Sequence, residues 1–64
     1  MNAINLIESG SFAEACYNQN SIAELESALA GQPDANDMAQ WGLSADEWRE
    51  QISTALAAKR EDAE

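Results

Sequence analysis

The stretch Trp41-Gly42-Leu43-Ser44-Ala45-Asp46-Glu47-Trp48 decides how this chain folds, because one helix is expected to end and another to begin within it. Gly42 suits a helix end, since glycine readily adopts the left-handed conformation that a helix C-terminus often needs. Ser44 and Glu47 have the spacing of a capping box, in which each side chain bonds the other residue's backbone amide. The apolar residues on either side of this cap are spaced as a hydrophobic staple. The octapeptide therefore predicts a sharp joint between two helices.

The same helix-start signal occurs twice more, earlier in the chain. Ser11 with Glu14 and Ser21 with Glu24 repeat the S-x-x-E spacing before runs with helical apolar periodicity. The chain has thirteen alanines, one threonine and no valine, a composition that favours helix over sheet. We therefore predict an all-α fold, a compact bundle of three to four short helices in a single domain.

The helix bounds follow from apolar spacing and turn residues. We expect a short helix or turn over 3–8, interrupted by Gly10, and helices over 11–17, 21–30, 35–41 and 45–60. The single domain is expected to span 1–60, with 61–64 as a frayed acidic tail. The side chains expected to face the core in the last three helices are Ile22, Leu25, Leu29, Met38, Trp41, Trp48, Ile52, Ala55, Leu56 and Lys59.

The last two expected helices resemble a helix-turn-helix motif. Glycine lies in the turn, an apolar residue follows, serine caps the next helix, and Trp48 comes six residues after Gly42. A helix that reads DNA carries bases or amides at its start, with cations nearby for phosphates. Here that helix opens with Ala45-Asp46-Glu47 and adds Glu50. We expect the helix-turn-helix-like shape without DNA reading, and a tight glycine turn between any two helices explains the same pattern.

Charge is the most informative feature of the composition. The chain has twelve acids, three bases and no histidine, for a net charge of −9, and the bases are Arg49, Lys59 and Arg60. Direct binding to nucleic acid or to an anionic membrane surface requires cations, so we expect neither. A protein with a basic patch, such as a nucleic-acid-binding protein, would be attracted. An acidic surface that serves solubility alone is the other interpretation.

Catalysis and metal binding find little support in the residue types. Without histidine no Ser-His or Cys-His pair can form. Zinc prefers cysteine and histidine ligands, and Cys16 is the one such residue in the sequence. Residues 34–37 are similar to the start of a calcium loop, but Ala39 and Ala45 stand where glycine and glutamate are needed. We expect no enzyme, metal or cofactor. The lone thiol, and the absence of a basic-apolar leader or a long apolar stretch, favour the cytoplasm.

These observations rank three functions. The first is a non-enzymatic regulator or inhibitor that binds a basic surface of a larger partner, as a nucleic-acid mimic; anti-CRISPR and other phage or mobile-element inhibitors are similar in size and charge. The second is an assembly subunit or homodimer held by apolar contacts, and the third a helix-turn-helix-like transcriptional accessory or antitoxin. The expected partner-binding residues are Glu24, Glu26, Asp34, Asp37, Asp46, Glu47 and Glu50, with Trp41 and Trp48 as apolar hot-spot candidates.

Overall fold

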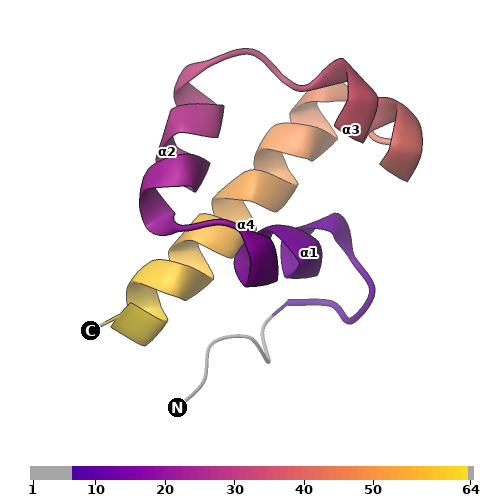
Figure 1. The fold of residues 1–64 in the computed structure, drawn as a ribbon. Helices are drawn as coiled ribbons and strands as arrows, with labels where there is room; N and C mark the ends of the chain where they lie inside the picture. Colours follow the sequence, from indigo (N-terminus) through magenta and orange to yellow (C-terminus); the bar gives the residue numbers. More distant parts are fainter. Residues whose placement is uncertain (1–6, 64) are drawn as a thin grey trace.

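A computed structural model describes residues 7–63, which form four helices and no strand. The helices are α1 (Phe12–Gln19), α2 (Ile22–Ala30), α3 (Ala35–Trp41) and α4 (Ala45–Ala63), arranged as a small bundle (Figure 1). The all-α fold and the helix-turn-helix-like pair α3–α4 agree with the prediction. Most of the element expected over 3–8 lies outside the described residues, and residues 7–10 form a bend and a turn.

Helix α4 is the element on which the others pack. α1 and α2 lie against its length, and α3 meets it near its start (Figure 1). Helical spacing on α4 creates an apolar stripe that faces both neighbours, so one helix supplies half of the core. The buried hydrophobic residues are Ile7, Phe12, Ala13, Cys16, Leu25, Trp48, Ile52, Ala55, Leu56 and Ala58. None of the described helices is long and apolar enough to cross a bilayer.

Two of the three predicted capping boxes are complete. At α4, the Glu47 amide donates to Ser44 Oγ at 3.2 Å and the Ser44 amide donates to the Glu47 carboxylate at 2.9 Å. At α2, Ser21 and Glu24 make the same two bonds, at 3.2 and 2.8 Å. These caps satisfy backbone donors that have no partner inside the helix. Polar side chains therefore fix where α2 and α4 begin.

The predicted box at α1 is only half formed. The Glu14 amide donates to Ser11 Oγ at 3.2 Å, but the Glu14 carboxylate accepts from the Gly10 amide at 3.0 Å. The Ser11 amide instead donates to the Glu8 carbonyl at 3.2 Å, in the preceding turn. Because that turn already uses the Ser11 amide, the Glu14 carboxylate bonds the amide of the preceding residue, Gly10.

Two further details differ from the prediction. Helix α4 continues to Ala63, so 61–63 are helical rather than a frayed tail, and Tyr17 of α1 donates a hydrogen bond to Asp62. Trp41 was expected to face inward but is 37% exposed, and α3 contributes no buried residue. Trp41 stays exposed because α3 has 7 residues and contacts α4 only near the start of α4.

Candidate functional site

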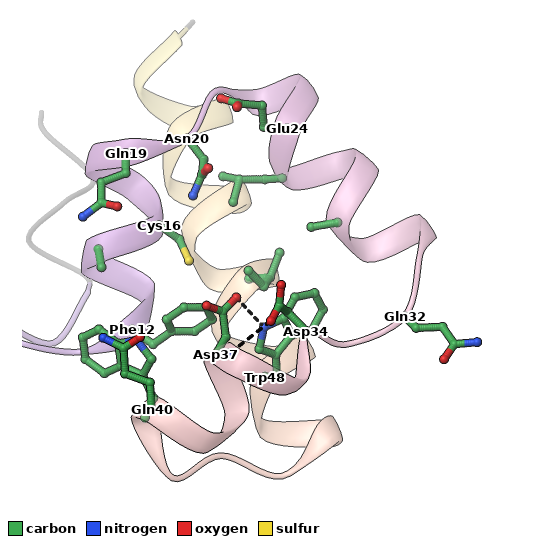
Figure 2. Close-up of a pocket in the computed structure, with 15 residues that line it drawn as sticks. Phe12, Cys16, Gln19, Asn20, Glu24, Gln32, Asp34, Asp37, Gln40 and Trp48 are labelled. Carbon is green, nitrogen blue, oxygen red and sulfur yellow. Dashed lines mark hydrogen bonds between the residues drawn. The ribbon is translucent and has the colours of Figure 1, made fainter.

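A groove of about 480 Å³ opens between α1, α2 and α3, with α4 beneath it. We call it the α1–α3 groove. Figure 2 shows Cys16, Asn20 and Asp37 pointing into it, while Gln32 points away. Its polar lining holds three carboxylates and four amides and, in the described part of the chain, no base. The principal lining residues are Phe12, Cys16, Leu25, Trp48 and Ile52 at the apolar floor, and Gln19, Asn20, Glu24, Gln32, Asp34, Asp37, Gln40 and Trp41 around them.

The three carboxylates of the groove also hold local structure. Asp34 caps α3, accepting from the Asn36 and Asp37 amides at 2.8 and 3.2 Å. Asp37 accepts from the indole N–H of Trp48 at 3.4 Å, a bond near the upper distance limit (Figure 2). Glu24 belongs to the α2 capping box. A carboxylate has about four acceptor positions, so these bonds leave capacity for a further donor.

The two tryptophans have different environments. Trp48 is 2% exposed and belongs to the core, so it is not available as a surface hot spot. Leu56, on the same helix, is 6% exposed and is buried as well. Among residues 7–63, Trp41 is the one large hydrophobic residue that is exposed. The centroid of its ring lies 5.5 Å from that of Phe12. An apolar interface would therefore depend on Trp41.

Cys16 reports on the electrostatics of the groove. Burial raises the pKa of its thiol to about 11, and the charge of Asp37 adds to the effect. Both causes disfavour the thiolate, because a low-dielectric environment and a nearby negative charge each penalise a second anion. The groove therefore carries negative potential beside an apolar floor, and little of the thiol is ionised at neutral pH.

A second group of carboxylates lies at the starts of α3 and α4, and we call it the acidic end. It consists of Asp34, Asp37, Asp46, Glu47 and Glu50. Asp46 and Glu50 are exposed, one helical turn apart, and within residues 7–63 their carboxylates make no hydrogen bond or ion pair. Glu47 is fixed by its capping box, and the backbone amide and hydroxyl of Ser44 hold its pKa below the usual range. The acidic end thus combines fixed and unpaired negative charges.

All three bases are engaged elsewhere. The Arg49 guanidinium donates to the Leu29 carbonyl at 3.4 Å, near the C-terminal end of α2. The Lys59 ammonium lies 4.9 Å from the centre of the Tyr17 ring. Arg60 forms an ion pair with Glu26, which makes Glu26 a structural partner on the surface. Residues 45–50 of α4 carry three acids and one base, whereas residues 59–62 carry two bases and two acids, so the excess negative charge of α4 lies near its start.

The structure divides the seven predicted acids between these places. The groove and the acidic end share Asp34 and Asp37; Glu24 lines the groove only, Asp46, Glu47 and Glu50 belong only to the acidic end, and Glu26 lies in neither. Sequence reasoning missed the amides and Phe12, because helical spacing within one element does not show which faces of three helices meet. Within the described residues no group of three or more acids or cysteines is placed to hold a metal. No family model, curated protein or solved structure matches this chain.

Proposed function

We propose that this chain is a non-enzymatic, protein-binding regulator or inhibitor whose acidic end engages a basic surface on a larger partner. The observation that carries the proposal is the excess of negative charge at the starts of α3 and α4. Five carboxylates lie there with one base, Arg49, while Arg49, Lys59 and Arg60 contact α2 or α1. An unopposed patch of one sign attracts and orients a partner of the opposite sign.

In the sharper form of the proposal, the partner's basic surface normally binds nucleic acid. Carboxylates presented on a rigid helix start would then take the place of phosphates. Asp46 and Glu50 suit this role best, because they are exposed and their carboxylates have no partner among residues 7–63. The inhibitor would compete directly with the nucleic acid for the same cations.

The test uses two matched charge reversals on α4. Glu50 and Glu61 are both exposed and lie eleven residues apart, which is about three turns and about 16 Å along the same side of the helix. The wild-type protein and the Glu50→Lys and Glu61→Lys variants are immobilised and incubated with a cell lysate. Bound proteins are then eluted with a gradient of salt or of competing duplex DNA. We expect a nucleic-acid-binding protein to be retained by wild type and by Glu61→Lys, and to be released by salt and by DNA.

The double variant Asp46→Lys with Glu50→Lys should lower the partner's affinity by at least about tenfold, since each reversal replaces attraction with repulsion. Circular dichroism checks that the fold is unchanged. Equal retention by the Glu50 and Glu61 variants would contradict the proposal. Salt-resistant self-association in place of a basic partner would support the assembly subunit instead.

A further inference from the structure

We propose that the α1–α3 groove receives an arginine side chain of the protein partner, with its guanidinium held by Trp41 and the carboxylate of Asp37. This inference rests on the proposed function and adds a second contact region to the acidic end. It assigns a recognition role to α3, which contributes no buried residue to the core.

The arrangement of α3 is the first argument. Asp34, Asp37 and Trp41 follow one another at spacings of three and four residues, so they share a face of α3, and all three line the groove. The Phe12 ring contacts the Trp41 ring, and Trp41 as a whole residue is 37% exposed. A tryptophan ring beside carboxylates is a site for a cation, because the ring face attracts positive charge and the carboxylate bonds it.

The chemistry of the lining favours arginine over lysine. A guanidinium is planar, stacks on aromatic rings and presents five donors, whereas an ammonium is a compact, strongly hydrated point charge. The groove offers a ring, carboxylates and the amide oxygens of Asn20 and Gln40. Its apolar floor suits the methylene stem of the side chain. A volume of about 480 Å³ also lies in the range of ligand pockets, ~300–1,000 Å³.

The negative potential of the groove is the second argument. Asp37 lies close enough to Cys16 to raise the pKa of the thiol, and no base among residues 7–63 lines the groove to offset that charge. A bound guanidinium would neutralise Asp37. An anionic occupant would meet three carboxylates, so charge complementarity selects a cation.

The first experiment titrates the protein with the capped peptide acetyl-Gly-Arg-Gly-amide and follows the two indole N–H signals by NMR. Trp48 donates its indole N–H to Asp37 and Trp41 lines the groove, so each signal reports on a different side of the site. We expect saturable shifts of both signals. The same peptide with citrulline in place of arginine has the same shape without the charge, and it should cause no shift.

Matched neutral variants locate the contact. Asp37→Asn should weaken the peptide's affinity by at least about tenfold, because the charge-assisted bond is lost while an amide oxygen remains for Trp48. Glu61→Gln removes the same charge at the far end of α4 and should change the affinity less than about twofold. Trp41→Leu keeps apolar bulk and also weakens binding, which provides a second test if Asp37→Asn is unstable.

The outcomes separate this inference from the proposed function. Absent shifts, equal shifts with the citrulline peptide, or equal effects of the Asp37 and Glu61 variants would overturn the arginine site. If a basic partner is lost with Glu50→Lys but retained in full by Asp37→Asn and Trp41→Leu, the function stands and the groove is not its contact. If the peptide binds as expected but no basic partner is captured, the site stands and the proposed function fails.

Discussion

At the scale of single residues, Cys16 shows how its place in the fold determines its chemistry. Burial and the Asp37 charge raise the pKa of the thiol from 9.0 to about 11. The thiolate is the nucleophile, so a pKa that is two units higher leaves about 100-fold less thiolate at neutral pH. We predict that a disulfide reagent such as DTNB labels the folded protein at least about 100-fold more slowly than the unfolded chain, measured by absorbance.

The variants of the groove provide the control for this prediction. Asp37→Asn should accelerate labelling, by less than full exposure would, because burial is the larger cause of the shift. Asp46→Asn should leave the rate unchanged, because Asp46 lies outside the groove. Labelling of the folded protein at the unfolded rate would show that the thiol is accessible and its pKa ordinary.

Glu47 gives a second prediction, on pH dependence. Its hydrogen bonds to Ser44 lower its pKa in the folded state, so the ionised form stabilises the fold. That contribution is present above the unfolded pKa and is lost as the pH falls through the folded value. Glu47→Gln should therefore lower the melting temperature at about pH 7, and the difference from wild type should shrink towards about pH 3.

Glu61→Gln is the matching control, because its carboxylate belongs to no capping box. Its difference from wild type should stay small at both pH values. A Glu47→Gln effect that grows on acidification would have the wrong sign for a lowered pKa, and would assign the stabilisation to another group.

At the scale of elements, the turn between α3 and α4 depends on one backbone conformation. Gly42 has φ 67°, in the left-handed region, and nothing lies within 4 Å of a Cβ placed there. Gly42→Ala therefore adds backbone strain without a steric clash, and should lower the free energy of unfolding by about 1–2 kcal/mol in urea denaturation.

Gly31 provides the matched comparison at the end of α2. It has φ −94° and ψ −159°, an extended conformation, and a Cβ there would meet two carbonyl oxygens at ordinary contact distance, 3.7 and 3.8 Å. Gly31→Ala should change the free energy of unfolding by less than about 0.5 kcal/mol. Equal losses at both glycines would mean that alanine acts by a cause other than the left-handed conformation.

Much of the element structure could be predicted, because helix starts depend on local spacing. Ser21 with Glu24 and Ser44 with Glu47 fixed two starts correctly, and Gly42 fixed one end. The end of α4 was predicted three residues early. Its last turn is stabilised by the hydrogen bond from Tyr17 to Asp62, and residue spacing within one helix does not reveal a contact with another helix. The orientation of Trp41 was wrong for a similar reason. Its exposure depends on where a short helix meets its neighbours.

The candidate site was predictable only in its charges. Carboxylates can be counted in a sequence, so Asp37 and Glu50 were both named, but their partners could not be read there. Glu26 looked equivalent to Glu24 until the fold placed Arg60 beside it. The groove depends on the approach of α1, α2 and α3, and no local pattern encodes it.

At the scale of the whole molecule, self-repulsion should make stability depend on salt. The molecule measures 33 × 23 × 17 Å, and at about 10 mM salt the Debye length of ~30 Å spans it, so nearly all its acids repel one another. At about 150 mM the length falls to ~8 Å. We predict a higher melting temperature at the higher salt, by about 4–8 °C if repulsion costs about 1 kcal/mol.

Charge reversal at the acidic end checks the cause of this effect. Glu50→Lys reduces the net negative charge and places a lysine one turn from Asp46, so its melting temperature should rise less with salt. Sodium chloride and potassium chloride should act alike, since screening depends on ionic strength. A melting temperature that falls with added salt would show that attractive pairs such as Arg60 with Glu26 outweigh the repulsion.

The dominance of α4 has a consequence for synthesis on the ribosome. α1, α2 and α3 are translated before the helix that they pack on, so none of them has its main partner when it leaves the exit tunnel. Their apolar faces stay accessible to chaperones and proteases until Trp48, Ile52 and Leu56 have emerged. A stop codon inside α4 therefore does not yield a smaller version of the domain; it releases three helices without a core, and the cell's degradation machinery receives an unfolded chain.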